Sequence, residues 1–441
     1  MGKGFWGMLI QRAALLDGRT VDIRLGRRVE AMADGLQPMA GEDVLDAAGG
    51  TAIPGLHDHH VHLRSAAAAL TSVRVGPGEV RSRDALRAVL ARADVGVDGW
   101  IRAVGYHEAV AGPLDRAVLD EVSPNVPVRV QHRSGVLWTL NSAGLAAVRL
   151  PDHPDGRLRS ADPGWTHALQ RNDAGLGEIS RRLSAFGVTG VTDATPDLTA
   201  EDVLDFAEAQ RHGELCQRVE VLAPAKRILH DDDLDLDALA DWITARHHQG
   251  GIVALHCVTA MQLVVTIAAL RQAGSRAGDR IEHGAVIPDD CLADLRELGV
   301  LVVTQPNFVA ERGEQYLTDV PADEHCRLWR VASLCGAQIP VALSTDMPFG
   351  DADPWAAMRA AVHRSTPSGS VLGAKESIDA ATALAMFLGA PEQPHVPRQL
   401  AVGMPADVCL LAAPPRDVLA TLDASLVAAT VYDGAVVYRA G

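Results

Sequence analysis

The 441-residue sequence is poor in aromatic side chains, in basic charge and in long apolar runs. Phe, Trp and Tyr supply only 4% of the residues although 48% are hydrophobic, so Ala, Val and Leu must fill most of the core. The 40 Lys and Arg residues are outnumbered by 56 Asp and Glu residues, which gives a formal net charge of −16. Because nucleic acids and anionic membranes demand basic surfaces, this balance argues against both as partners.

No stretch approaches the roughly 18–20 consecutive apolar residues that a helix needs to span a bilayer, and residues 1–6 lack the apolar core of a signal peptide. The six cysteines are scattered and include no C-x-x-C pair, which is typical of reduced thiols and not of a disulfide framework. We therefore expect a cytoplasmic protein that acts on a small-molecule substrate. Self-association into a homo-oligomer is left open.

Both ends of the chain are rich in short β-like segments, whereas the centre alternates β-like and helical patterns. Asp433-Gly434, set between two β-rich runs, is a strong signal for a two-residue hairpin. We expect the termini to meet in a small β-sandwich formed by residues 1–53 and 396–441. Residues 54–395 would then form the larger central domain.

Eight apolar segments of the central domain, separated by helical patterns, predict a TIM-type (β/α)8 barrel and hence an α/β fold. The first candidate strand carries His60 and His62, and the others are 127–132, 187–193, 218–223, 252–256, 280–283, 300–305 and 340–346. The segment 64–126 is too long for one crossover connection, so we expect it to hold an inserted loop or small subdomain over the barrel mouth.

The motif PGLHDHHVHL at residues 54–63 places two histidines on one face of the first strand. Side chains alternate along a strand, so His60 and His62 point the same way, about 6–7 Å apart, and can converge on one metal. Asp58 shares that face and would hold a ligand imidazole in the correct tautomer. His57 and His59 fall on the opposite face and are not counted as ligands.

Further metal-ligating side chains end or follow later strands. His256, His283 and Asp346 end the predicted fifth, sixth and eighth strands, and Lys226 follows the fourth. A barrel brings all of these ends to one rim, where its chemistry takes place. Any one of them is equally well explained by an ordinary hydrogen bond or turn, but the pattern repeated over five strand ends predicts a metal site.

These motifs together resemble the amidohydrolase superfamily in its two-domain form, a β-sandwich beside a (β/α)8 barrel. The resemblance covers almost the whole chain and rests on the motif at 54–63, RIEHG at 280–284, TQP at 304–306, STDMP at 344–348 and GMPADV at 403–408.

Within the superfamily, NS at 141–142 and DPW at 353–355 resemble the amidohydrolase-3 branch, which includes YtcJ-like proteins and N-substituted formamide deformylases. The sequence departs from that pattern in two places on the substrate side. CVT at 257–259 stands where many members have a Gly-Asp pair, and SGV at 134–136 replaces Asp-Gly-His. The substrate therefore cannot be taken over from better-known relatives.

The resemblance implies a hydrolase that cleaves a C–N bond in an amide, N-formyl or cyclic imide group. It implies two Zn²⁺ ions per chain, although other divalent metals suit the same ligands. Lys226 would bridge the ions as an N-carboxylated lysine, and Asp346 would take a proton from the attacking water and pass it to the leaving nitrogen. The implied metal ligands are His60, His62, Lys226, His256, His283 and Asp346.

Two other functions stay open at this point, a mononuclear deaminase-type amidohydrolase and a catalytically inactive relative that serves as a scaffold. If Lys226 is instead an ordinary cation that binds a substrate carboxylate, the enzyme holds a single metal. Asp193, which ends the predicted third strand, is expected to support the ligands. Side chains expected to meet the substrate, with hydrogen bonding within the rim as the competing explanation, are His107, His132, Trp138, Gln305, Asn307 and Arg312.

Overall fold

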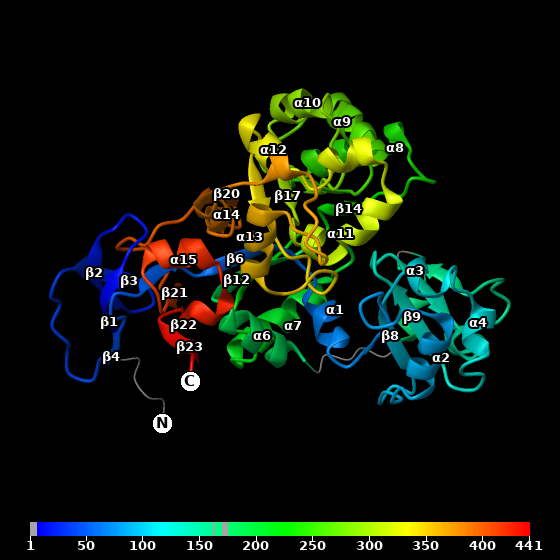
Figure 1. Cartoon of the computed structure of the whole chain (residues 1–441), viewed down its shortest axis with the longest axis horizontal. Coiled ribbons are helices and arrows are strands. Elements are labelled where there is room, and N and C mark those ends of the chain that lie inside the picture. Colours follow the sequence, from blue (N-terminus) through cyan, green and yellow to red (C-terminus); the bar gives the residue numbers. More distant parts are fainter. Residues whose placement is uncertain (1–6, 161, 163, 170–174) are drawn as a thin grey trace. The chain divides into compact units, whose positions relative to one another are not determined.

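The chain folds as an α/β protein that divides into two units (Figure 1). The structure, a computed structural model, describes residues 7–160, 162, 164–169 and 175–441. Unit 1 combines Met1–His62 with Gly177–Gly441, and unit 2 comprises Leu63–Leu176. Among the described helices, none has the length and apolar character that crossing a membrane requires.

The two ends of the chain build one mixed sheet of eight strands in unit 1, in the order β23-β22-β21-β5-β1-β2-β3 with β4 beside β1. The bounds are β1 Met8–Ala14, β2 Thr20–Leu25, β3 Val29–Ala33, β4 Asp43–Asp46, β5 Thr51–Pro54, β21 Val408–Leu411, β22 Val427–Tyr432 and β23 Ala435–Arg439. The predicted hairpin is confirmed, because Asp433 and Gly434 join β22 to β23 with φ angles of 49° and 80°. The termini meet as expected, but the predicted β-sandwich is not confirmed.

The core of this sheet draws on both ends of the chain. Ile10 and Ile23 from the N-terminal strands are fully buried in one cluster with Val408 and Val431 from the C-terminal strands. Burying an aliphatic side chain of this size stabilises the folded state by ~1.5–3 kcal/mol. The two terminal segments therefore depend on each other for their hydrophobic core.

Eight further strands of unit 1 run parallel and follow one another in chain order. One sheet contains β6 Leu56–Val61, β12 Val188–Asp193 and β13 Arg218–Val221, and the second contains β14 Lys226–Ile228, β15 Ala254–Cys257, β16 Arg280–His283, β17 Leu301–Thr304 and β18 Val341–Leu343. Backbone hydrogen bonds of 3.0 Å from Asp346 to His60 and of 2.7 Å from His62 to Met347 link the ends of β6 and β18. The ladders do not close into the predicted barrel, because the strands remain in two sheets.

One strand predicted from the sequence belongs elsewhere, and another was missed. Residues 127–132 lie outside the parallel array, because β9 Val128–His132 belongs to the sheet of unit 2. The eighth strand of the array is instead β14, which begins at Lys226, so Lys226 follows the strand at 218–223 as predicted but lies in a strand of its own. The pattern missed β14 because a three-residue strand is too short to show an alternation of apolar and polar side chains.

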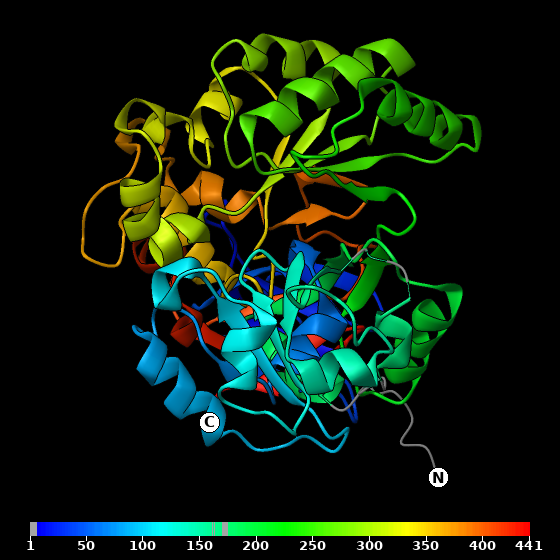
Figure 2. The same ribbon diagram turned by 90° about the vertical axis from the view of Figure 1, so that its right-hand side faces the viewer.

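Helices alternate with these strands, and in both views α8, α9 and α10 lie side by side in green (Figure 2). Asp235 caps α8, and Thr259 with Gln262 forms a capping box that starts α9. Outside unit 2, the described helices of eight or more residues are α6 Leu176–Ala185, which begins at the boundary, α7 Ala200–Arg211, α8 Leu236–His248, α9 Ala260–Ala273, α10 Cys291–Leu298, α11 Asn307–Asp319 and α13 Pro354–His363. Shorter elements are α12 Ala332–Gly336, α14 Ala380–Ala385, α15 Pro415–Thr421, β19 Gly389–Ala390, β20 Gln393–Pro397 and the 3₁₀ turns Ala322–Arg327, Ala374–Glu376 and Ala424–Leu426.

Unit 2 has a sheet and a core of its own. The sheet order is β11-β10-β9-β8-β7, and one hydrophobic cluster joins Ile101 and Val130 of its strands to Leu86 of α2. The elements are α1 Leu63–Ala69, β7 Val73–Arg74, α2 Arg83–Ala91, β8 Ile101–Tyr106, α3 Glu108–Ala111, α4 Arg116–Asp120, β9 Val128–His132, β10 Leu137–Leu140, α5 Ser142–Ala147, β11 Arg157–Arg159 and the 3₁₀ turn Thr166–Ala168. The unit is longer than the predicted insertion at 64–126 because β9, β10 and β11 belong to it.

Candidate functional site

Strand β6 presents its histidines to two opposite faces, as the alternation of side chains predicts. The rings of His60 and His62 lie 5.3 Å apart on one face. On the other face His57 Nε2 lies 2.9 Å from Thr192 Oγ1. Gly190 makes room for that ring, since a Cβ there would lie only 2.4 Å from His57 Nδ1. The two faces of the strand thus carry two separate sets of imidazoles.

Asp346 completes a buried cluster with the two inner histidines. One ligand atom each of His60, His62 and Asp346 lies within 4.8 Å of the others, and all three residues are buried. Asp346 Oδ1 lies 3.4 Å from His62 Nε2 and 3.7 Å from His60 Nε2. Asp58 fixes the segment before Asp346, because its carboxylate accepts the backbone N–H of Thr345 at 3.1 Å and the Thr345 hydroxyl at 2.5 Å.

Lys226, His256 and His283 extend this cluster from three other strands. Lys226 Nζ lies 3.0 Å from His60 Nε2. The ring of His283 lies 4.8 Å from that of His60 and 4.5 Å from that of His256. The structure therefore brings together all six residues that the sequence predicts as metal ligands; their role as ligands remains a prediction.

Two members of the cluster have left-handed backbone conformations, with φ angles of 71° at His283 and 57° at Asp346. His and Asp are among the residue types most often found there, but the conformation still costs of order 1–3 kcal/mol. The reversal at His283 has a geometric effect. Along a regular strand Glu282 and His283 would face opposite sides, yet both lie next to His60. Such strain is concentrated at functional sites.

The hydrogen bonds of the imidazoles show which nitrogen carries the proton. His60 Nδ1 contacts a Glu282 carboxylate oxygen, and His283 Nδ1 lies 2.8 Å from Gln305 Oε1. The Gln305 amide is oriented by its own Nε2–H, which donates to Ser344 Oγ at 2.8 Å. Because a carboxylate and an amide oxygen only accept, Nδ1 is protonated in both rings and Nε2 keeps its lone pair. That is the tautomer in which imidazole binds metals through Nε2.

Burial keeps these imidazoles neutral. It lowers the pKa of His60 and His256 well below the ordinary value, helped by the charge of Lys226 at both, and it lowers the pKa of His283 as well. At Asp346 burial acts in the opposite direction, but His62, His283 and Lys226 outweigh it and lower the pKa of the carboxyl. These shifts favour neutral imidazoles at His60, His256 and His283 and an ionised carboxylate at Asp346, the forms that ligate a divalent metal.

The Lys226 amine is also shifted toward its uncharged form. Burial lowers its pKa to about 8, although the carboxylates of Glu282 and Asp346 act to raise it. An uncharged amine is the form that reacts with CO₂. The side chain is only 5% exposed, so its environment differs from that of a surface lysine.

The surroundings of Asp346 Oδ1 indicate whether the cluster fits a metal. It is buried and makes no hydrogen bond to the part of the chain that the structure describes, although two imidazole nitrogens lie within 4 Å. An unpaired buried carboxylate oxygen is costly. Divalent metal binding would satisfy it together with the Nε2 lone pairs, so the donor set fits the metal that the sequence predicts.

The three predicted substrate contacts of unit 1 already have partners within the protein. Gln305 holds His283, as described, and Asn307 Nδ2 donates to the Thr345 carbonyl at 3.0 Å. Arg312 donates to the Phe349 carbonyl and its guanidinium lies 3.9 Å from the centre of the Phe308 ring. These contacts agree with the competing explanation, hydrogen bonding within the rim. Whether the residues also meet substrate remains a prediction.

Unit 2 holds the other three predicted contacts and a second possible ligand group, formed by His107, Glu108 and His132. His107 Nδ1 accepts the backbone N–H of Ala109, and His132 Nδ1 accepts that of Ser134, both at 3.2 Å. The remaining nitrogen of His132 lies 3.1 Å from a Glu108 oxygen.

Trp138 lies in β10 of unit 2, where it is buried and stacks in a T-shaped contact on Trp165, with ring centres 6.1 Å apart. The guanidinium of Arg102 lies over it, 5.2 Å from the ring centre. Its placement is that of a core residue.

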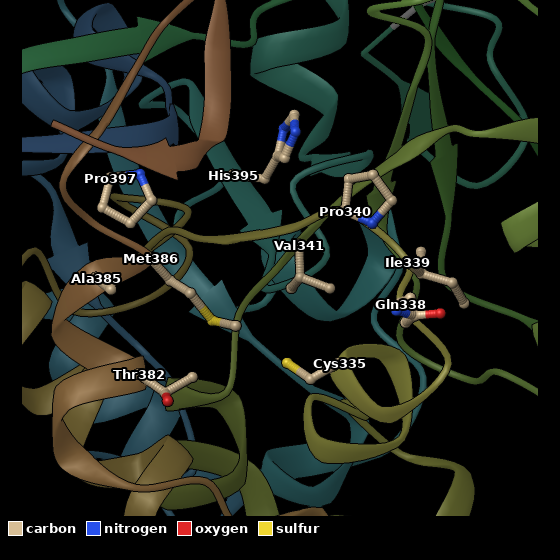
Figure 3. Close-up of a pocket in the computed structure, with 10 residues that line it drawn as sticks. All are labelled: Cys335, Gln338, Ile339, Pro340, Val341, Thr382, Ala385, Met386, His395 and Pro397. Carbon is tan, nitrogen blue, oxygen red and sulfur yellow. The ribbon is translucent and has the colours of Figure 1, made fainter.

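A pocket of about 380 Å³ lies elsewhere in unit 1, around the N-terminal end of β18 (Figure 3). Its wall includes Pro340, Val341, Met386 and Pro397, and His395 is among its few polar side chains. Val341 begins β18 whereas Asp346 follows the end of that strand, so this pocket is separate from the His/Asp cluster.

Sequence reasoning missed Arg280 and Glu282. Both are buried in β16, where Arg280 Nε donates to Glu282 Oε1 at 2.6 Å and Glu282 contacts His60. A signal was present, because the segment RIEH places two opposite charges two residues apart in a strand, and hence on one face. Charged residues are rarely buried unless they are paired.

Comparison with known proteins agrees with this geometry. The amidohydrolase family matches residues 43–438 of the chain. An N-substituted formamide deformylase from Arthrobacter pascens is 24% identical over 433 residues, which cover 78% of this chain and 79% of that protein.

Two solved structures share the fold along nearly the whole chain. An uncharacterized metal-dependent hydrolase from Pyrococcus horikoshii OT3 matches with a TM-score of 0.70 and 18% identity, covering 93% of this chain and 98% of that one. A second, from Pyrococcus furiosus, matches with a TM-score of 0.68 and 18% identity, covering 93% and 99%.

Proposed function

The chain belongs to the amidohydrolase family, and on this premise we propose that it is a metal-dependent hydrolase that cleaves a C–N bond of an amide, N-formyl or cyclic imide group. One observation carries the proposal. Asp346 Oδ1 is buried without a hydrogen-bond partner among the described residues, and it lies 3.7 Å from Nε2 of His60, whose ring is held at Nδ1, and 3.4 Å from Nε2 of His62. The deformylase from Arthrobacter pascens, which acts on an N-substituted formamide, supports the N-formyl class.

We propose that His60, His62 and Asp346 hold one ion and His256 and His283 a second, with Zn²⁺ the metal that suits imidazole and carboxylate best. Lys226 would join the two as an N-carboxylated lysine. Its buried amine, with a pKa of about 8, supports this role. The divalent ions would supply polarisation of the carbonyl and a water of lowered pKa.

The residues of the chain then have separate tasks. Asp346 accepts the proton of the attacking water while the water oxygen bonds to the carbonyl carbon. The C–N bond breaks in the next step, and the leaving nitrogen takes the proton from Asp346. Asp58 holds Asp346 in place for both transfers through its two bonds to Thr345.

The two parallel sheets would bring these residues together as a (β/α)8 barrel. Taken in chain order, β6, β12 and β13 are followed by β14 to β18, and the end of β18 returns to β6. This cyclic order supports a barrel within residues 54–395, interrupted by unit 2, with the terminal segments 1–53 and 396–441 in a second domain.

A deaminase remains the second candidate on this fold. Such an enzyme usually has a glutamate that donates a proton near the sixth strand, and Glu282 lies there. The contacts of Glu282 favour the hydrolase. Its carboxylate is engaged by Arg280 and by His60, so it has no free position from which to donate a proton to a substrate. Metal content separates the candidates, with about two ions per chain expected for the hydrolase, one for the deaminase and none for an inactive scaffold.

The proposal is tested by measuring bound metal by elemental analysis and then assaying the loaded protein on N-formyl, N-acyl and cyclic imide compounds. Asp346→Asn should keep the fold and much of the metal but lower turnover by roughly 10²–10⁴-fold, because an amide cannot accept the proton of water. Arg227→Ala is the control, because the Arg227 guanidinium stacks on Trp242, 5.4 Å from the ring centre, and belongs neither to the cluster nor to the predicted substrate contacts. Near-normal turnover in Asp346→Asn would exclude Asp346 as the base.

A further inference from the structure

A chain of buried charged groups runs from β16 to His60. Arg280 donates from Nε to Glu282 Oε1 at 2.6 Å and from one terminal nitrogen to Glu282 Oε2 at 3.2 Å. The same terminal nitrogen donates to the carbonyl of His59 at 2.8 Å. Glu282 Oε2 in turn contacts His60 Nδ1. The side chains of His60 and Glu282 are fully buried, and that of Arg280 is 4% exposed.

Burying these charged groups is unfavourable for folding, which suggests that they are needed for function. Bringing a guanidinium and a carboxylate into the interior costs several kcal/mol per ion, which their attraction recovers only with good geometry. Here Arg280 donates to both carboxylate oxygens, and Oε2 also contacts the imidazole of His60, the residue directly after the carbonyl that Arg280 holds. Arg280 thus fixes both the carboxylate and the backbone of the strand that carries the imidazole.

We propose that Glu282 and Arg280 are positioning residues that hold His60 with its proton on Nδ1 and its Nε2 lone pair directed at the metal. The proposal rests on the proposed function and deepens it. Glu282 acts through His60 and does not contact the metal or the substrate. Partners of this kind orient the ring and increase its strength as a ligand.

The opposite face of the same strand supplies a matched control. His57 Nε2 is bonded to Thr192 Oγ1, and both residues are as deeply buried as His60 and Glu282. Thr192→Val removes the buried partner of one β6 histidine on the outer face, and Glu282→Gln removes the negative charge from the partner of another on the inner face. A general effect of disturbing β6 would therefore appear in both variants.

The experiment measures the affinity for Zn²⁺ by chelator competition in the wild type, Glu282→Gln and Thr192→Val. We expect Glu282→Gln to weaken binding roughly 10–100-fold and Thr192→Val to leave it unchanged. In a His60→Ala background, adding Glu282→Gln should cause no further loss, because the residue through which it acts is gone. An equal loss in that background, or equal losses in Glu282→Gln and Thr192→Val, would overturn the proposal.

A second measurement needs no bound metal and reads the wild type itself. ¹⁵N NMR of the metal-free wild type, with the His60 signals assigned by their absence from His60→Ala, reports which ring nitrogen carries the proton. A proton on Nδ1 supports the role of Glu282, and a proton on Nε2 overturns it. If the wild type binds no divalent metal, the proposed function fails, while this measurement still decides whether Glu282 positions His60.

Discussion

Among the residues that the structure describes, two groups of histidines and carboxylates differ in what their ring nitrogens are bonded to. In the unit 1 cluster, Nδ1 of His60 and of His283 meets an oxygen that can only accept. In unit 2, Nδ1 of His107 and of His132 accepts a backbone N–H. A neutral imidazole has one lone pair, so the first pair keeps it on Nε2, where that of His60 faces the Lys226 side chain, whereas the second pair has already used it for a backbone N–H.

The two groups differ in burial and in origin as well. His60 and Asp346 are buried and come from strand ends far apart in the sequence, whereas Glu108 of the second group is exposed and follows His107 directly. Residue type and proximity alone would rank the two groups as equals. The partner of Nδ1 distinguishes the two groups, and it predicts that metal binds in unit 1 and not at the unit 2 group.

The largest effect that bears on this contrast is expected from Lys226→Ala. Removing the bridge should reduce bound metal and turnover by more than the roughly 10–100-fold that a supporting partner contributes. A short carboxylic acid that fills the vacated space should restore part of both. Elemental analysis and an activity assay with and without added acetate measure these effects.

Arg227→Ala is the matched control for that experiment. Arg227 is the next residue, but its guanidinium stacks on Trp242, 5.4 Å from the ring centre, and so lies away from the cluster. The Arg227→Ala variant should therefore keep its bound metal. Full metal and activity in Lys226→Ala would reject the carbamate and leave a single-metal enzyme.

The alternation of side chains along β6 was sufficient to predict His60 and His62 on one face and His57 on the other. It could not predict how His283 enters the cluster. Glu282 and His283 are adjacent, and strand periodicity allows only one of them on the inner face. The positive φ of His283 removes that restriction, and no sequence pattern reports a local backbone reversal at a histidine.

The prediction of strands failed in two situations. A very short strand was missed, and a strand of unit 2 could not be told from a strand of the parallel array because both are apolar. Residues 127–132 have the apolar character of a buried parallel strand, and β9 is one, but of the sheet in unit 2. A strand's periodicity says that it is buried and not which neighbour it pairs with. The family resemblance supplied Lys226, whose strand of three residues gives no pattern.

A smaller effect concerns the pH dependence of stability. Burial lowers the pKa of His57, His59, His60 and His256 well below 6.5. Below that pH the unfolded chain binds protons that the folded protein does not, so the stability present above pH 6.5 is lost as the pH falls. Each histidine contributes up to about 1.4 kcal/mol per pH unit to the free energy of unfolding. Asp58 opposes them with one proton, because burial raises its pKa to about 7.

Replacing one of these histidines should make the free energy of unfolding depend less steeply on pH below pH 6.5. Neither ring nitrogen of His59 has a hydrogen-bond partner among the residues that the structure describes. His59→Phe fills similar space, so it should reduce the slope below pH 6.5 by up to about 1.4 kcal/mol per pH unit and raise stability at pH 7 by about 1–3 kcal/mol. Urea unfolding of the metal-free protein between pH 5 and 8 measures both. An unchanged slope would contradict the buried neutral state of His59.

The smallest effect is expected in unit 2, where Glu108→Gln should leave metal binding unchanged. The His132–Glu108 pair is partly exposed, with 20% and 43% of the side chains accessible, and pairs of this kind contribute ~0–1 kcal/mol. To look for metal there without interference, the titration uses a His60→Ala/His62→Ala background, which disables the unit 1 cluster. Zn²⁺ bound in that background and lost on adding Glu108→Gln would show that the unit 2 histidines give up their backbone hydrogen bonds to bind metal. The hydrogen bond at Nδ1 would then not distinguish the two groups, and the prediction that only the unit 1 group binds metal would be wrong.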